Sequence, residues 1–188
     1  MTDHISPSRR ATLQGVGALA LGLGTLAASR GFAADETPAT RLKALGIELP
    51  AIAAALGSYA PFRREGKILY VSGQLPTRAG QLIYTGSVPA QVSVEQAQEA
   101  AKQCAINILA VVAKACDGDL NRVAGCLKLT GYVAAGPDFR EHPKVVNGAS
   151  DLMKAVFGDS GQHARAAVGV ASLPLGAPVE VEAVFSLK

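Results

Sequence analysis

Two different spacings of apolar residues along this chain predict helices in some stretches and strands in others. Over residues 93–116, apolar residues recur every three or four positions, and Ser93 and Gln96 have the spacing of a helix-capping box. Residues 143–157 predict a second long helix, which ends at Gly158, and residues 40–46 predict a short helix that ends at Gly46. Strand patterns occur over residues 59–64, 67–72, 81–84, 122–133, 164–171 and 179–187.

The order of these elements predicts an α+β domain built from two layers. Glu65 and Gly66 have the character of a two-residue hairpin loop between the first two strands. The later strands are interleaved with the two long helices. We therefore expect one mixed six-stranded sheet that carries both helices on the same face.

The face of the sheet opposite the helices also needs a cover. In the last strand, Glu180 and Glu182 alternate with apolar residues, which are Val179, Val181, Ala183 and Phe185. In the strand before it, Arg165 lies among alanines and a glycine. A sheet with helices on one side and apolar groups on the other usually packs against something, and no residues of this chain remain to cover it. An oligomer is expected on this ground.

Length and charge narrow the class of protein. The chain has 188 residues, of which 49% are hydrophobic and 18% charged, so it is long enough for one folded domain and too apolar to be disordered. The formal net charge is +3. Residues 1–33 contribute three arginines and one aspartate, which leaves 15 basic and 14 acidic residues in the remainder. The residues after 33 are therefore nearly neutral and offer no basic surface of the kind that binds nucleic acid.

The first 33 residues have the pattern of an export signal. Arg9 and Arg10 stand before a 14-residue apolar run, residues 15–28, which is too short to span a bilayer as a helix of about 20 residues. Small residues for cleavage lie near Ala33 and Ala34. The arginine pair resembles a twin-arginine signal; an ordinary secretory signal or a retained anchor are the alternatives. We predict a signal over 1–33, a linker over 34–40 and a domain over 41–188, located in the periplasm without stable membrane association after cleavage.

The three cysteines are expected to be buried free thiols. Cys104 and Cys116 lie on one predicted helix, about 18 Å apart at 1.5 Å per residue, and cannot form a disulfide. Pairing of Cys126 with either of them is left open. With no Cys-x-x-Cys motif and only three histidines, no metal site is expected.

Arg165 and Glu180 are the residues with the most suggestive chemistry. An arginine among small residues on a strand can bind a carboxylate through both of its nitrogens. A structural salt bridge to Glu180 or Glu182 is the alternative. Glu180, expected on the adjacent strand of a hairpin, could be that partner or a general acid or base. His163 stands near Arg165 without a nucleophile or an aspartate in a known motif. From the residues alone, the chain is an oligomeric α+β domain with an Arg/Glu pair on adjacent strands.

Four segments together resemble the reactive-intermediate deaminase (Rid) family, also called the YjgF or L-PSP endoribonuclease family. They are YVSGQLP at 70–76, NILA at 107–110, HARAAVGVASLP at 163–174 and VEVEA at 179–183. The similarity extends over residues 42–187, with the segments in the family's order. An arginine followed 15 residues later by a glutamate, each in its own strand motif, is the specific part of the pattern.

The resemblance implies a chorismate-mutase-like fold that forms a homotrimer, with the three sheets in a central β-barrel and a cleft between each pair of subunits. It implies hydrolysis of enamine or imine intermediates, such as 2-aminoacrylate, to a 2-keto acid and ammonia without a cofactor. Arg165 would hold the substrate carboxylate, and Glu180 would activate water and manage the protons. The cleft would be lined by Tyr59, Ser72 and Asn147.

Two positions depart from the family pattern and leave alternatives open. Ala167 stands where many active members have cysteine, and Gly169 replaces a larger residue, which is expected to widen the cleft. The main alternative is a non-catalytic trimer that binds a small carboxylate or keto acid at the same clefts. A ribonuclease is disfavoured by the neutral body and by export, and a purely structural trimer is a further alternative.

Overall fold

The computed structural model describes residues 37–52 and 57–188, so the predicted export signal lies outside the described residues. None of the helices in this part of the chain is long and apolar enough to cross a membrane. The helices are α1 (Pro38–Ala44), α2 (Val94–Ala115) and α3 (His142–Phe157), with short 3-10 turns over Leu120–Arg122, Gly158–Gly161 and Pro174–Gly176. The strands are β1 (Phe62–Glu65), β2 (Ile68–Gln74), β3 (Thr77–Arg78), β4 (Gln81–Leu82), β5 (Val123–Ala134), β6 (Ala164–Val170) and β7 (Val179–Leu187).

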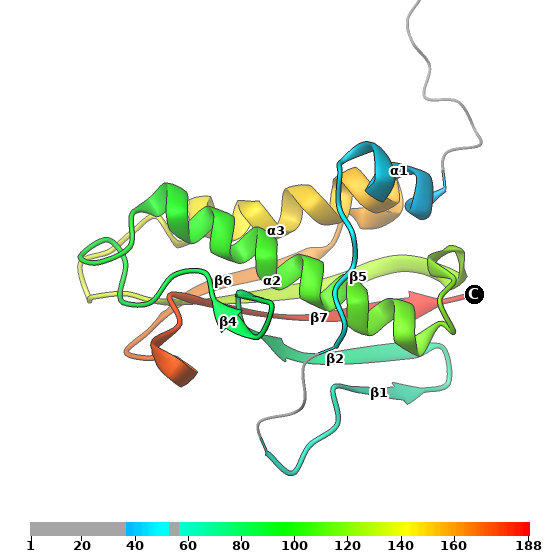
Figure 1. Ribbon diagram of the computed structural model, residues 1–188, viewed down its shortest axis with the longest axis horizontal. Helices are drawn as coiled ribbons and strands as arrows, with labels where there is room; N and C mark the ends of the chain where they lie inside the picture. Colours follow the sequence, from blue (N-terminus) through cyan, green and yellow to red (C-terminus); the bar gives the residue numbers. More distant parts are fainter. Residues whose placement is uncertain (1–36, 53–56) are drawn as a thin grey trace, which may run out of the picture. The chain divides into compact units, whose positions relative to one another are not determined.

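The main sheet is mixed and has five strands in the order β1-β2-β7-β5-β6 (Figure 1). Only β5 and β6 run parallel; the other pairs are antiparallel. The expected six-stranded sheet is thus wrong by one strand. Residues 81 and 82 form β4, which pairs only with β3 in a separate two-stranded ladder. The turn between β3 and β4 is made by Ala79 and Gly80, both with positive φ, and the ladder is only two residues long.

The expected hairpin of the last two strands is also wrong, because β5 lies between β6 and β7. Eight residues separate these two strands, among them Pro174 and Pro178, which is more than a tight turn needs. β7 instead pairs antiparallel with β2 on one side and with β5 on the other. The hairpin of β1 and β2 does form, with Gly66 and Lys67 as its loop, one residue later than predicted. Gly66 has a φ of 56°, which a glycine adopts without strain.

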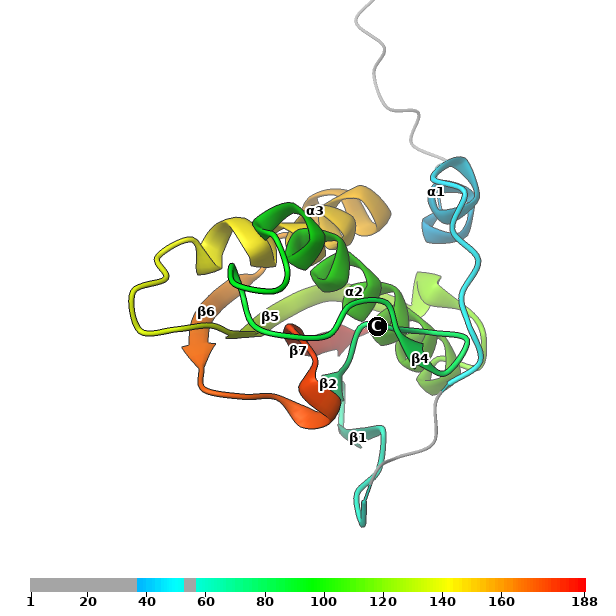
Figure 2. The ribbon, with the colours of Figure 1, turned by 60° about the vertical axis from the view of Figure 1, so that its left-hand side comes forward.

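Both long helices cover the same face of the sheet, as predicted (Figures 1 and 2). The capping box at the start of α2 is present: Ser93 accepts a hydrogen bond from the backbone of Gln96, and the Gln96 side chain accepts one from the backbone of Ser93. The helices pack closely where α3 carries Gly148. A Cβ at this position would lie 2.0 Å from the carbonyl oxygen of Gln98 on α2, so only glycine permits this approach.

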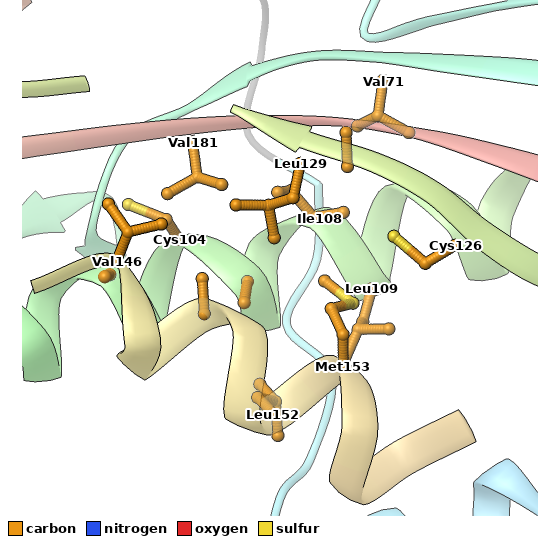
Figure 3. Close-up of a cluster of buried hydrophobic side chains, with 14 of the residues drawn as sticks. Val71, Cys104, Ile108, Leu109, Cys126, Leu129, Val146, Leu152, Met153 and Val181 are labelled. Atoms are coloured by element: carbon orange, nitrogen blue, oxygen red, sulfur yellow. The ribbon is translucent and has the colours of Figure 1, made fainter. Parts of the chain in front are cut away.

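The hydrophobic core lies between these helices and the sheet (Figure 3). In β7 every second residue from Val179 to Leu187 is buried, which confirms the predicted alternation. Cys104, Cys116 and Cys126 are free and buried, also as predicted. The core side chains drawn from α2, α3 and the sheet include Ile108, Leu109, Leu129, Val146, Met153 and Val181.

The face of the sheet opposite the helices, called here the helix-free face, exposes apolar side chains to solvent. The ladder places Tyr70 beside Val184 on this face, and Val168 beside Tyr132. Tyr70 is 51% exposed and Val168 is 42% exposed. Thr130, on the same face beside Glu182, has a buried hydroxyl with no hydrogen-bond partner among the described residues. This surface fits the expected oligomer, which stays a prediction.

The domain begins slightly earlier than predicted. Helix α1 starts at Pro38, within the stretch 34–40 expected to be a linker, and Thr37 caps it by accepting a hydrogen bond from the backbone of Thr40. Arg41 donates a hydrogen bond to the carbonyl oxygen of Val156 at the end of α3 (3.4 Å). The short helix is therefore attached to the main helical layer.

Candidate active site

The Arg165 side chain lies on the helix side of the sheet, at its edge. Its strand partner in β5 is Leu129, which is fully buried under the helices, so Arg165 shares that face. Nη1 of Arg165 donates hydrogen bonds to Oδ1 of Asn147 at 2.8 Å and to Oγ of Ser150 at 3.1 Å, both on α3. We call these three residues, with His163 beside Ser150, the Arg165 group. The sequence prediction that Arg165 and Asn147 belong to one site is consistent with this geometry.

No carboxylate among the described residues lies within 4.0 Å of the Arg165 guanidinium. The alternative of a structural salt bridge to Glu180 or Glu182 is therefore wrong. Both hydrogen-bond partners of Arg165 are neutral acceptors, which orient the guanidinium without neutralising it. An exposed, oriented and uncompensated guanidinium is suited to bind a carboxylate from outside the domain.

Ala167 and Gly169 follow Arg165 on the same face of β6. Ala167 is partly buried and packs against the core. A Cβ on Gly169 would lie 2.5 Å from Nε2 of His142, at the start of α3. The imidazole of His142 occupies the space that a larger side chain at position 169 would fill, and the effect of Gly169 on the width of the cleft stays a prediction.

Glu180 lies on the other face of the sheet. In β7 it alternates with buried apolar residues, and it pairs with Tyr132 of β5. Its carboxyl group lies against Gly73, in the bulge of β2 between Val71 and Gln74. A Cβ at position 73 would lie 1.8 Å from Oε1 of Glu180, so a glycine is required for this approach.

The surroundings of Glu180 favour its protonated form. Burial raises the pKa of the Glu180 carboxyl above its usual value, and the nearby carboxylate of Glu182 raises it further. The Tyr132 hydroxyl donates a hydrogen bond to Oε1 of Glu182 at 3.2 Å. Burial is also the largest cause that raises the pKa of the Tyr132 hydroxyl. The nearby carboxylates of Glu182 and Glu180 raise this pKa further. A carboxyl group with a raised pKa keeps its proton to higher pH and is therefore suited to donate it.

Ser72 adjoins Gly73, against which the Glu180 carboxyl lies, and it also reaches the segment that carries Tyr59. Oγ of Ser72, next to Gly73, donates a hydrogen bond to the carbonyl oxygen of Ala60 at 2.7 Å. This bond fastens the segment before β1 to β2, and the segment carries Tyr59, whose side chain is 51% exposed. We call Glu180, Gly73 and Ser72 the Glu180 group.

The Arg165 group and the Glu180 group do not meet within one copy of the chain. Arg165 pairs with Leu129 and Glu180 with Tyr132, so they are two strands and three residues apart and on opposite faces. With strands spaced about 4.8 Å and residues about 3.3 Å apart, their Cα atoms are separated by roughly 14 Å. No small substrate bridges the two side chains through the sheet. A site that uses both needs one group from each of two copies.

Several residues of these surroundings could not be found from the sequence patterns. Ser150 lies 13 residues before His163, and the two come together only because α3 packs on β6. The Tyr132–Glu182 hydrogen bond depends on the pairing of β5 with β7. Ser150, His163 and Arg165 also line a surface hollow of about 380 Å³ with Asp151 and Lys154. In the part of the chain that the structure describes, no group of three or more histidines, cysteines or acidic residues could hold a metal ion.

Comparison with known proteins adds to this geometry. The family model "YjgF/chorismate mutase-like, putative endoribonuclease" matches residues 39–185. Protein TCP17 of Trypanosoma cruzi is 45% identical over 150 residues, 79% of this chain and 93% of that protein. A 2-iminobutanoate/2-iminopropanoate deaminase of Capra hircus is 33% identical over 138 residues, 70% of this chain and 81% of that protein. A crystal structure of an Agrobacterium tumefaciens protein of unknown function shares 48% identity with a TM-score of 0.75, covering 80% of this chain and 92% of that chain.

Proposed function

The chain belongs to the YjgF/RutC/Rid family, and from this premise we propose that it hydrolyses reactive imines and enamines of small 2-amino acids to 2-keto acids and ammonia. The observation that carries the proposal is the guanidinium of Arg165, which is exposed, oriented by Asn147 and Ser150, and free of any described carboxylate partner. Such a group binds the carboxylate that 2-imino acids have in common. Relatives named 2-iminobutanoate/2-iminopropanoate deaminases support the reaction class.

The working unit in this proposal is a homotrimer with its sites between subunits. Two features support an assembly of this kind. Arg165 and Glu180 lie on opposite faces of the sheet in one copy, and the helix-free face leaves Tyr70 and Val168 half exposed. In a closed ring of identical subunits, the edge of one copy that carries Arg165 faces the Glu180 group of the next copy, and the contact repeats around the ring.

Hydrolysis of the imine needs a substrate held in a fixed orientation and one group that transfers protons. Arg165 holds the substrate carboxylate, and Tyr59, Ser72, Asn147 and Ala167 line the cleft, Ala167 through its backbone. Protonated Glu180 gives its proton to the imine nitrogen, and its carboxylate then takes a proton from the water that adds to C2. Glu180 then returns this proton to the amino group of the carbinolamine and takes up the hydroxyl proton, so that ammonia leaves and a C=O bond replaces the C=N bond. Burial and the carboxylate of Glu182 raise the pKa of Glu180, which favours the protonated form that begins the reaction. No cofactor is required, because an imine is already activated.

The proposal is tested with the full chain and 2-aminoacrylate, generated in place from serine by a dehydratase. Ammonia release above the solvent rate should be lost in Arg165→Ala and in Glu180→Gln. Arg122→Ala and Glu65→Gln are the matched controls. Arg122 is exposed and pairs with Asp117, and Glu65 is exposed at the end of β1. Equal turnover in the Glu180→Gln variant would contradict the role of this residue.

A second candidate function is the binding of a small carboxylate without turnover. The observation that favours it is the alanine at position 167. In that case the wild-type protein accelerates no imine hydrolysis, and calorimetry with 2-oxobutanoate shows binding that Arg165→Ala removes and Glu180→Gln retains. Cleavage of RNA by the purified protein would instead favour the nuclease named in the family description.

We also propose that the protein acts in the periplasm after export by the twin-arginine route, without stable attachment to the membrane. The proposal rests on Arg9 and Arg10 before the apolar run over 15–28. Replacement of both arginines by lysine should leave the protein in the cytoplasmic fraction. If this variant is exported as well as the wild-type chain, the route is a different one.

A further inference from the structure

A series of connected hydrogen bonds starts at the guanidinium of Arg165 and passes through Ser150 and His163. Nη1 of Arg165 donates to Oγ of Ser150 at 3.1 Å. Oγ of Ser150 lies 3.0 Å from Nε2 of His163, and Nδ1 of His163 lies 2.7 Å from the carbonyl oxygen of Gly161. The chain therefore links α3, β6 and the turn between them, and it ends at a backbone atom.

The direction of each bond in this chain follows from its ends. A carbonyl oxygen only accepts, so Nδ1 of His163 carries a hydrogen and donates to Gly161. In the neutral imidazole, Nε2 is then the acceptor, and it takes the hydroxyl hydrogen of Ser150. This leaves the lone pairs of the Ser150 oxygen for Arg165, which can only donate. Every donor in the chain has an acceptor, so the arrangement specifies one tautomer and one hydroxyl orientation.

We propose that Ser150 and His163 are positioning residues, which fix the Arg165 guanidinium so that it presents its remaining N–H groups to the substrate carboxylate. This inference rests on the proposed function, since it concerns the same carboxylate anchor. Arg165 is exposed, and a long side chain at an edge strand otherwise samples several rotamers that binding would have to restrict. Asn147 holds the same Nη1 from a second direction, so the two contacts together define the plane of the group.

The other charged groups near these hydrogen bonds do not hold the Arg165 guanidinium. Asp151 and Lys154 line the same hollow as Ser150 and His163, yet neither forms an ion pair with a described residue. His142, the first residue of α3, lies against Gly169 and Phe139. It has no hydrogen bond to the Arg165 group among the described residues. His142→Gln is therefore a matched control for substitutions at His163.

The test compares variants that remove these hydrogen bonds with variants that preserve them. Binding of 2-oxobutanoate to the full-length protein is measured by calorimetry. Ser150→Ala and His163→Ala should weaken binding by about 5-fold, the size of one hydrogen bond's net contribution. Ser150→Thr keeps a hydroxyl, and His163→Gln keeps an acceptor and a donor, so both should bind within about 2-fold of wild type. In turnover, the two alanine variants should raise KM and leave kcat unchanged, because the carboxylate is held equally in the ground and transition states.

A second readout does not depend on any ligand. In nitrogen NMR of the labelled protein, the neutral imidazole of His163 should carry its hydrogen on Nδ1, and Ser150→Ala should shift its Nε2 resonance while leaving that of His142 in place. A hydrogen on Nε2 in the neutral form, or equal binding by wild type and both alanine variants, would overturn the proposal. A His163→Gln variant as weak as His163→Ala would also overturn it, since packing would then explain the loss. Absence of imine turnover with the binding pattern intact would contradict the deaminase function alone.

Discussion

Replacing Gly73 by alanine should remove catalysis while leaving the fold intact. The Cβ that Gly73→Ala introduces would lie 1.8 Å from Oε1 and 2.8 Å from Cδ of Glu180. Contacts below 3.0 Å are essentially never seen for real Cβ atoms, so Oε1 must move away by at least 1.2 Å. Gly73 has no positive φ, and therefore its backbone accepts alanine without strain.

The expected loss of activity follows from this displacement. The atom that the new methyl group meets is the end of a flexible side chain, so the carboxyl rotates away and the free energy of unfolding should change by less than about 1 kcal/mol. Misplacement of a catalytic group by about 1 Å can lower the rate by about 100-fold. We therefore expect kcat to fall by about that factor, with the melting temperature close to that of wild type.

The assay is release of ammonia from 2-aminoacrylate, together with thermal unfolding followed by circular dichroism. Gly136→Ala is the control, because a Cβ at position 136 would meet nothing within 4 Å and the residue has no positive φ. Wild-type turnover in a folded Gly73→Ala protein would refute the assignment of Glu180 as the proton-transfer group in its observed position.

Three further predictions concern the surroundings of the site and the core. Glu182→Gln removes a like charge from Glu180, so the pKa of Glu180 should fall, and the alkaline limb of the pH–rate profile, where the required protonated form is lost, should move to lower pH; an unmoved limb would assign it to another group. Gly148→Ala forces α3 away from the Gln98 carbonyl and should lower the unfolding free energy by about 1–3 kcal/mol in denaturant titration, whereas an unchanged midpoint would contradict the close packing. Burial raises the pKa of Cys126 to about 12 and those of Cys104 and Cys116 above their usual value, so iodoacetamide at pH 8 should label these thiols only after unfolding; rapid labelling of the native protein would contradict their burial.

The sequence patterns predicted the local elements well, because these depend on neighbours in the chain. The capping box at Ser93, the helical spacing over 93–116 and the alternation in β7 all reflect contacts of one element with one buried face. The hairpin of the last two strands was predicted wrongly, because insertion of β5 between β6 and β7 depends on pairing between residues far apart in sequence. No local signal distinguishes that pairing from a hairpin.

The same limit applied to the candidate site. The residue pattern singled out Arg165 and Glu180, and the resemblance to the family added Asn147, yet the sequence could not tell that Arg165 and Glu180 lie on opposite faces of the sheet. It also gave no sign of Ser150, whose contact with His163 arises from the packing of α3 on β6. The glycines at 73 and 169 acquire meaning only beside the Glu180 carboxyl and the His142 ring that occupy their space.

The central claim is that Arg165 from one copy and Glu180 from another complete each site, and mixed oligomers test it most directly. Full-length Arg165→Ala and Glu180→Gln proteins, each inactive alone, are unfolded together in equal amounts and refolded as one assembly. Random mixing should leave about one quarter of the interfaces with both groups intact, and turnover should return to about a quarter of the wild-type value. Complete absence of activity in mixed oligomers of native size and stability would contradict a site shared between subunits.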